Sequence, residues 1–209
     1  MKLLSILLLL GALQDVPKNP DPHARYVIYL HGRIIEEQGP RPTHPDWGVY
    51  EYQKILDALA APGLTVISEQ RKPGTDMDQY AEHVAGQVRK LLAAKVPAEN
   101  IAVVGFSKGG GIATRASSLL KNDKVRFVFL AACGNGDFSG STLDVRGRIL
   151  SIYEASDEMG HSCAQLFAKS KGTGERKEIK IDTGKQHGTF YQPRKEWTEP
   201  LLGWIQKAR

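Results

Sequence analysis

Short apolar runs alternate with longer segments of helical period along most of the chain. Between residues 76 and 95, apolar side chains recur three or four positions apart, which is typical of a helix with one buried face. Most of the apolar runs lack strict alternation of apolar and polar positions, as expected of strands covered on both faces. The pattern predicts strands at 25–30, 64–68, 101–104, 125–131, 148–153 and 178–181, and helices at 50–61, 76–95, 108–120, 161–171 and 195–207. Regular alternation of strands and helices predicts an α/β domain, with a mostly parallel sheet of about six or seven strands and helices on both faces.

The N-terminal segment MKLLSILLLLGALQ differs from the rest of the chain. One lysine precedes an apolar run of about eleven residues, which is too short to span a membrane and has the length of a signal-peptide core. We predict a signal peptide at 1–14, a linker at 15–24 and a single α/β domain at 25–209. The protein is then expected to be secreted or periplasmic, with no stable membrane insertion after the signal is removed. An uncleaved anchor or a first strand is the alternative, and the cleavage position is open.

Composition fits one ordinary domain: 209 residues, of which 41% are hydrophobic and 24% charged. The net charge is +5 and the isoelectric point is near 9.1, but the basic residues are scattered among nearly as many acids. We therefore expect a solvated basic surface and no nucleic-acid partner. The only cysteines are Cys133 and Cys163. They could pair in an oxidising compartment or remain buried free thiols, and both interpretations stay open.

One apolar run ends abruptly in the sequence IAVVGFSKGG, residues 101–110. Its Gly105-Phe106-Ser107-Lys108-Gly109 segment matches the pattern G-x-S-x-G, in which serine occupies a tight turn between a strand and a helix. The flanking glycines leave space for the backbone, and the turn lifts the hydroxyl group out of the sheet. Because ligands gather at the carboxyl ends of parallel strands, Ser107 is a candidate nucleophile.

A serine hydroxyl needs a neighbouring base, and the base needs a group that orients it. Four segments in order along the chain resemble motifs of the α/β-hydrolase family: YLHG at 29–32, GFSKGG at 105–110, IYEASDE at 152–158 and DTGKQHGTF at 182–190. The resemblance spans nearly the whole mature chain and suggests a small esterase-like member. It implies Ser107 as the nucleophile, His187 as the general base and then general acid, and Asp157 as the carboxylate that orients His187.

The positions of the two partners agree with these roles. Asp157 follows an apolar strand, and His187 follows another short strand in a glycine-containing loop. Asp157 could instead hold a turn or cap the next helix, which would leave Asp137, Glu154 or Glu158 as the acid. Asp137, after the preceding strand, is the first of these alternatives.

Acyl transfer also needs hydrogen-bond donors for the developing oxyanion. The resemblance implies the backbone amide of Lys108 as one donor. The second would come from the segment His31-Gly32-Arg33 after the first strand, with the amide of Arg33 as the donor and Gly32 as the fallback. His31 itself is predicted to hold the loop in place.

The surroundings of this site are harder to predict. The connection between 131 and 148 is too short for a cap domain, so we expect a site without a lid. The irregular segment 33–48 contains Trp47, which either forms a pocket wall or packs for stability. Basic residues at or beyond the strand ends indicate a cationic mouth, namely Arg33, Arg71, Lys72 and Lys108.

No metal motif, phosphate-binding loop or complete dinucleotide fingerprint is present in the sequence, so we expect no metal and no cofactor. The sequence therefore predicts a serine hydrolase that cleaves an ester, or else a thioester or amide, of a small-molecule acyl substrate. A non-catalytic binding protein with the same fold is the alternative. The oligomeric state is left open.

Overall fold

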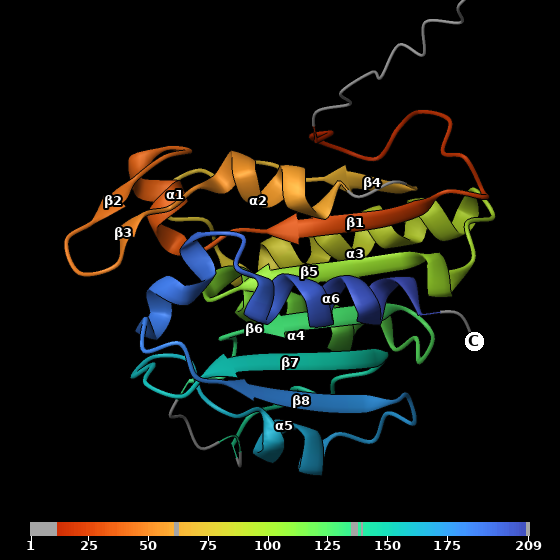
Figure 1. The fold of residues 1–209 in the computed structure, drawn as a ribbon. Helices are drawn as coiled ribbons and strands as arrows, with labels where there is room; N and C mark the ends of the chain where they lie inside the picture. The colour runs from red at the N-terminus through yellow and green to blue at the C-terminus, as the bar shows by residue number, and fades with distance from the viewer. Residues whose placement is uncertain (1–11, 61–62, 135–137, 139, 208–209) are drawn as a thin grey trace, which may run out of the picture.

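The computed structural model describes residues 12–60, 63–134, 138 and 140–207. At its centre is a six-stranded sheet in which each neighbouring pair of strands is parallel, in the order β4-β1-β5-β6-β7-β8 (Figure 1). These strands are β1 (Arg25–Leu30), β4 (Leu64–Ile67), β5 (Ile101–Phe106), β6 (Arg126–Leu130), β7 (Arg148–Glu154) and β8 (Arg176–Ile181). Every strand predicted from the apolar runs is present, and the predicted fold class is confirmed.

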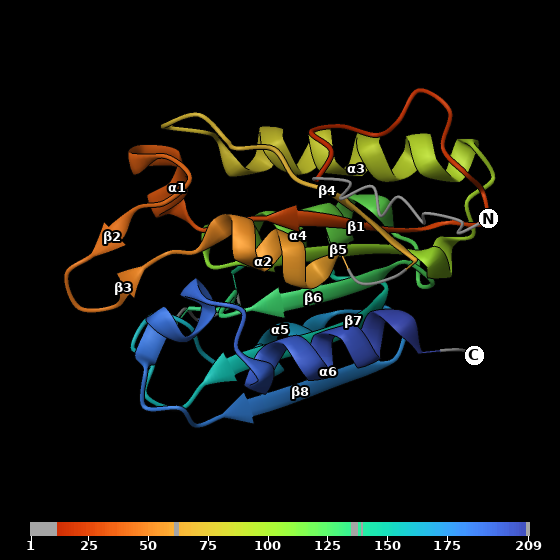
Figure 2. The ribbon, with the colours of Figure 1, turned by 45° about the horizontal axis from the view of Figure 1, so that its top comes forward.

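Helices cover both faces of the sheet (Figures 1 and 2). One face packs against α2 (Tyr52–Leu59) and α6 (Lys195–Gln206), and the other against α3 (Met77–Ala93), α4 (Lys108–Leu120) and α5 (Ala164–Lys169). Alternate residues of β1 enter the two apolar clusters: Val27 and Tyr29 pack on one side, and Tyr26 and Ile28 on the other. This double burial explains why the strands read as continuous apolar runs.

The start of α3 follows from its sequence. The Asp76 carboxylate accepts hydrogen bonds from the amides of Asp78 and Gln79, at 3.0 and 2.9 Å. A side chain in this position satisfies amides that have no partner within the helix. The buried residues Val84, Val88 and Leu91 then form the apolar stripe that predicted the helix.

The segment predicted to be irregular, 33–48, contains regular structure. It holds the short helix α1 (Arg33–Gln38) and most of a small hairpin of β2 (Thr43–His44) and β3 (Gly48–Val49). The prediction was wrong because a six-residue helix and two-residue strands are too short to produce a recognisable period. A 3₁₀ helix, η2 (Gln186–Tyr191), follows β8, and another, η1 (Ala98–Asn100), precedes β5.

The N-terminal end of the described chain lies along the edge of the sheet. The amide of Leu13 donates to the Val66 carbonyl at 2.8 Å, and the Ser68 amide donates to the Leu13 carbonyl at 2.7 Å. Residues 1–11 of the predicted signal peptide lie outside the described residues. Within the described residues, no helix has the length and apolar character needed to cross a membrane.

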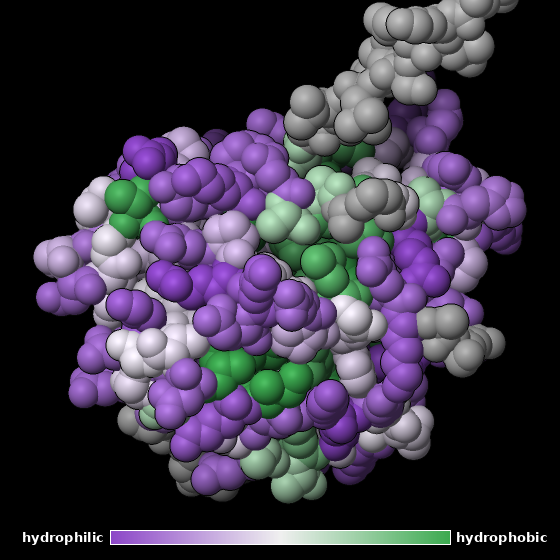
Figure 3. All heavy atoms as spheres, in the orientation of Figure 1, coloured by the Kyte–Doolittle hydropathy of each residue, from purple (hydrophilic) through white to green (hydrophobic). Residues whose placement is uncertain are grey.

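Much of the surface on the side seen in Figure 1 is polar (Figure 3). One apolar area lies below α6, over β7 and β8, where Leu150, Ile179 and Trp204 line a cavity of about 350 Å³. Lys177 and Lys180 are on β8, which is an edge strand of the sheet. Lysine residues on an edge strand discourage it from pairing with a strand of another chain.

Candidate active site

Ser107 occupies the turn between β5 and α4, with backbone angles φ 54° and ψ −118°. A non-glycine residue in such a conformation costs about 1–3 kcal/mol, which the surrounding structure must offset. The two glycines of the motif are required by close backbone approach. A Cβ atom at Gly105 would collide with the Gly109 carbonyl, and one at Gly109 would collide with the Leu30 carbonyl. The glycines thus allow α4 to start directly against the sheet, with Ser107 at its N-terminus.

Three of the predicted site residues meet at the carboxyl end of the sheet. The Oγ atom of Ser107 lies 2.9 Å from Nε2 of His187, and Nδ1 of His187 lies 2.7 Å from Oδ2 of Asp157. Asp157 follows β7 and His187 lies in η2, after β8. Asp157 and His187 are only 4% and 3% exposed. The structure therefore forms a continuous, largely buried chain of hydrogen bonds that ends at the serine hydroxyl.

The environment of Asp157 favours its ionised form. Burial alone raises the pKa of the carboxyl group, but the hydrogen bond and charge of His187 and the amides of Met159 and Gly160 outweigh it and lower the pKa from its ordinary value. The Met159 amide donates to Oδ1 at 2.9 Å, so both carboxylate oxygens have partners. A carboxylate held in this way presents a fixed negative charge to the imidazole ring.

The alternative acids have other positions. Glu154 is buried and accepts hydrogen bonds from the amides of Ser156 and Thr183, at 2.6 and 2.8 Å. It therefore joins the loops that carry Asp157 and His187. Glu158 is exposed, and its carbonyl contacts the ring of His161. Asp137 lies outside the described residues.

Two helices begin beside Ser107, and the first amides of a helix have no partner within it. Arg33 is the first residue of α1 and Lys108 the first of α4, as required of the predicted oxyanion donors. Gly32 and Arg33 line the same cavity as Ser107. Gly32, the fallback donor, is the N-cap residue of α1 and lies at the same helix N-terminus as Arg33. Both residues remain candidates for the second donor.

His31 is fully buried and holds the loop, as predicted. Its Nδ1 atom lies 2.8 Å from the Gly32 carbonyl, and its Nε2 atom accepts the amide of Arg71 at 2.9 Å. A ring that accepts at Nε2 donates at Nδ1, which assigns the tautomer. Burial first, and then the charge of Arg71, lower the pKa of His31 to about 3. His31 is therefore neutral near pH 7.

A cavity of about 200 Å³ opens over Ser107 and His187. Trp47 lines it, with its ring centroid 5.3 Å from that of His187, and stacks on His44 at 3.9 Å. Its indole Nε1 donates to Oε1 of Gln186 at 3.2 Å. Both interpretations of Trp47 therefore hold: it forms a wall of the cavity and packs the β2–β3 hairpin onto η2.

Size alone does not locate the site. A larger cavity, of about 510 Å³, lies between α3 and α4, where its lining includes Asp78, Arg115 and Leu119. None of the three hydrogen-bonded site residues lines it.

The charge at the mouth differs from the prediction. Oε1 of Glu36 lies 2.7 Å from Nε of Arg71, and Oε2 lies 2.5 Å from Nζ of Lys108. The side chains of Arg71 and Glu36 are 0% and 1% exposed, and that of Lys108 is 12% exposed. The expected cationic mouth is wrong because two of its four members are paired with Glu36 behind the site. At the cavity itself, Arg33 is accompanied by the acidic Glu37.

Glu36 was not identified from the sequence. It lies in the helix that was predicted to be irregular, and nothing in its local pattern indicates a buried ion pair. A glutamate facing inward from α1 can be anticipated only once that helix is known.

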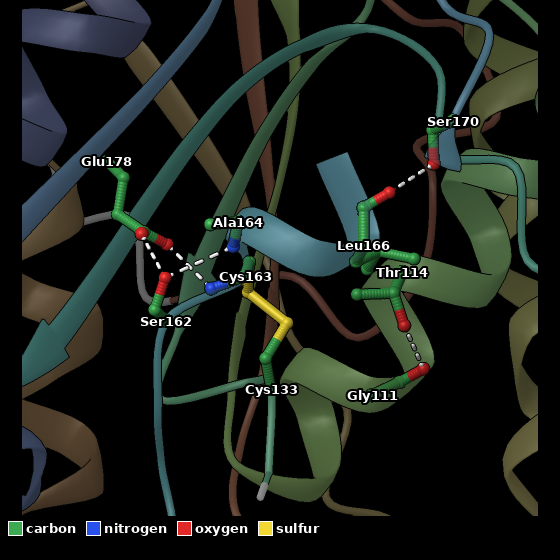
Figure 4. The surroundings of a disulfide bond; sticks show 9 residues. All are labelled: Gly111, Thr114, Cys133, Ser162, Cys163, Ala164, Leu166, Ser170 and Glu178. Carbon is green, nitrogen blue, oxygen red and sulfur yellow. Dashed lines mark hydrogen bonds between the residues drawn. A yellow bond between two sulfur atoms is a disulfide. The ribbon is translucent and has the colours of Figure 1, made fainter. Parts of the chain in front are cut away.

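Cys133 and Cys163 form a disulfide with a Cα–Cα distance of 5.3 Å (Figure 4). It links the loop after β6 to the segment that follows Asp157. The Cys163 amide and the Ser162 hydroxyl both donate to the Glu178 carboxylate of β8, at 2.7 and 2.5 Å. These contacts fasten the start of α5 and the loop before it to the sheet. Among the described residues, no group of three or more His, Cys, Asp or Glu side chains is arranged to hold a metal ion.

No protein-family model matches this sequence, and no curated protein matches it. Solved structures do share the fold. SOBER1 of Arabidopsis thaliana superimposes with a TM-score of 0.57 at 12% identity, over 88% of this chain and 98% of that chain. XC6422 of Xanthomonas campestris, described as an α/β serine hydrolase without a lid, gives 0.53 at 19% identity, over 92% and 84%. The RedJ thioesterase of Streptomyces coelicolor gives 0.53 at 12% identity, over 90% and 89%.

The fold class follows from the parallel sheet, the turn that carries Ser107 and these similar structures. This chain has the α/β-hydrolase fold. The described residues form one small domain without a cap.

Proposed function

We propose that the protein is a serine hydrolase that cleaves a small ester through an acyl-enzyme. The observation that carries this proposal is the hydrogen-bonded chain from Asp157 through His187 to Ser107, whose backbone is strained. The structural neighbours named as a serine hydrolase and a thioesterase support hydrolytic chemistry in general. Thioesters and amides are alternative substrates of the same machinery.

The proposed reaction follows from the positions of the side chains. Nε2 of His187 takes the proton of the Ser107 hydroxyl as Oγ forms a bond to the acyl carbon, and the resulting imidazolium is stabilised by Asp157. The carbonyl oxygen gains a negative charge and is held by the amides of Arg33 and Lys108. Collapse of the tetrahedral intermediate breaks the bond to the leaving group, which receives the proton from His187.

Water completes the cycle. A water molecule gives a proton to His187 and attacks the acyl carbon, and breakage of the bond to Oγ returns the proton to Ser107. The products are a carboxylic acid and the alcohol. No atom of a cofactor is needed in either half of the reaction.

The volume of the cavity limits the size of the acyl group that we propose for the substrate. About 200 Å³ is small compared with the 300 Å³ or more that drug-sized ligands need. Trp47 and His44 form an aromatic wall, and Arg33 and Glu37 place both signs of charge at the rim. We expect acetyl and butyryl esters of p-nitrophenol to be cleaved with higher kcat/KM than the decanoyl ester.

The test is covalent labelling with a fluorophosphonate probe, read as the intact mass of the protein. We expect an adduct on the wild-type protein and none on Ser107→Ala, because only an activated serine hydroxyl attacks phosphorus at a useful rate. A well-folded wild-type protein that takes no adduct and cleaves no ester would favour a non-catalytic binding protein instead.

We also propose that the protein works outside the cytoplasm, in the periplasm or in the medium. The apolar N-terminal run and the Cys133–Cys163 disulfide support this, because disulfides persist in oxidising compartments. Cell fractionation of the full chain, with N-terminal sequencing of the mature protein, tests it. Recovery of the intact chain with Met1 in the cytoplasm would contradict it.

A further inference from the structure

Buried side chains hold two backbone carbonyls of the loop after β1. The Gly32 carbonyl accepts from the His31 ring at 2.8 Å, and the His31 carbonyl accepts from Nη2 of Arg71. These partners are all buried, so the loop cannot exchange them readily for water.

Fixing the Gly32 carbonyl fixes the next amide. In a trans peptide, the C=O of one residue and the N–H of the next point in opposite directions. The hydrogen bond from His31 to the Gly32 oxygen therefore turns the N–H of Arg33 away from the ring. The direction of the proposed oxyanion donor is thus set by His31 and, through it, by Arg71.

The second donor is tied to the first by Glu36. This residue lies on α1, one turn after Arg33, and its carboxylate contacts Nζ of Lys108 at the start of α4, at 2.5 Å. The same carboxylate contacts Nε of Arg71 at 2.7 Å. The ion pair between Glu36 and Lys108 therefore spans the two helix N-termini whose first amides are the donors.

We propose that Glu36 is a positioning residue, and that its ion pairs with Lys108 and Arg71 set the spacing and direction of the two oxyanion donors. This inference rests on the proposed function. Lys108 then has two roles in this proposal: its amide is an oxyanion donor, and its side chain, 12% exposed, joins α4 to α1. The network carries two positive charges and one negative charge, so a net positive charge remains beside Lys108, the residue after Ser107, where it would favour a developing oxyanion.

A positioning role predicts a particular kinetic signature. Interactions that are made only with the oxyanion stabilise the transition state and leave the affinity for the substrate almost unaltered. Loss of the Glu36 link is therefore expected to lower kcat and to leave KM nearly constant. Binding of a boronic acid, whose adduct with serine is tetrahedral and anionic, is expected to weaken by a similar factor.

The experiment compares Lys108→Gln and Glu36→Gln with the wild-type protein on p-nitrophenyl butyrate and phenylboronic acid. Lys108→Gln keeps the backbone amide and leaves the Arg71–Glu36 pair intact, so it decides the outcome if Glu36→Gln does not fold. Glu82→Gln is the matched control, because its partner Arg89 lies 3.5 Å away on the exposed face of α3. Melting temperatures establish that each variant is folded.

We expect kcat to fall at least tenfold in Lys108→Gln and Glu36→Gln, KM to stay within twofold, and the boronic acid inhibition constant to rise at least tenfold. Glu82→Gln is expected to match the wild-type protein. A folded Lys108→Gln variant with kcat and boronic acid affinity within twofold of wild type would overturn the inference, as would a change confined to KM. A wild-type protein that neither hydrolyses esters nor takes the fluorophosphonate would overturn the proposed function, and this inference with it.

Discussion

Nδ1 of His187 lies 2.7 Å from Oδ2 of Asp157, and the other oxygen of that carboxylate accepts the amide of Met159. Asp157 is thus held at both oxygens while it fixes the imidazole ring. The ring can only present Nε2 to Ser107 as an acceptor if Nδ1 carries the proton, and an ionised Asp157 selects that tautomer.

Asp157→Asn is therefore expected to lower kcat by roughly 10³–10⁴-fold, because the amide group can stabilise the wrong tautomer and provides no charge for the imidazolium. Steady-state ester hydrolysis measures this loss. Glu158→Gln, at the next position and exposed, is the control and is expected to retain wild-type kcat. A folded Asp157→Asn variant that keeps wild-type kcat would show that the acid had been assigned to the wrong residue.

Gly109→Ala is expected to destabilise the protein by more than about 3 kcal/mol, or to prevent folding, because the new methyl group meets the Leu30 backbone. Gly203→Ala provides the comparison. Gly203 is also helical, but a Cβ atom there has open space, so alanine is expected to stabilise the protein by about 0.5–1 kcal/mol. Urea unfolding at neutral pH measures both, and a folded Gly109→Ala protein of wild-type stability would refute the close-packing account.

His31 links folding to pH. Its pKa is near 3 in the folded protein and about 6.5 when unfolded, so the unfolded state binds one more proton between these pH values. The contribution of neutral His31 to the free energy of unfolding is complete above pH 6.5 and is lost as the pH falls towards 3. Between pH 6.5 and 4, the free energy of unfolding is expected to fall by up to about 1.4 kcal/mol per pH unit more steeply in the wild type than in His31→Gln. Parallel stability curves would show that His31 takes up a proton within the folded protein.

The disulfide joins cysteines 30 positions apart, and removing it is expected to cost roughly 3–4 kcal/mol through the entropy gained by the unfolded chain. The Cys133→Ala, Cys163→Ala double variant is expected to unfold at lower urea concentration and to have lower kcat, since the disulfide restrains the segment after Asp157. A reducing agent is expected to lower the melting temperature of the wild type and to leave that of the double variant unchanged. An equal response of both proteins would mean that the cysteines are not bonded in solution.

Local sequence patterns predict much of this architecture. The strands β1, β5 and β6 at the centre of the large sheet appear in the sequence as nearly continuous apolar runs, because a strand covered on both faces has no polar side. Asp76 predicts the start of α3, because a capping carboxylate acts within a few residues of itself. The G-x-S-x-G segment likewise predicts the turn at Ser107, since a side chain at either glycine would collide with neighbouring backbone atoms.

What the sequence determined by itself, then, is the order of the main strands and helices and the turn that carries Ser107. It left Asp137, Glu154 and Glu158 beside Asp157 as candidate acids, and only the tertiary structure joined Asp157 and His187 to Ser107 in one chain of hydrogen bonds. Only the tertiary structure decided the helix α1, the pairing of the cysteines, the neutral state of His31 and the use of Glu36 between Lys108 and Arg71. These features depend on contacts between residues far apart in the chain. A buried ion pair leaves no periodic signal, because its stability comes from the exclusion of water by the whole fold and not from neighbouring residues.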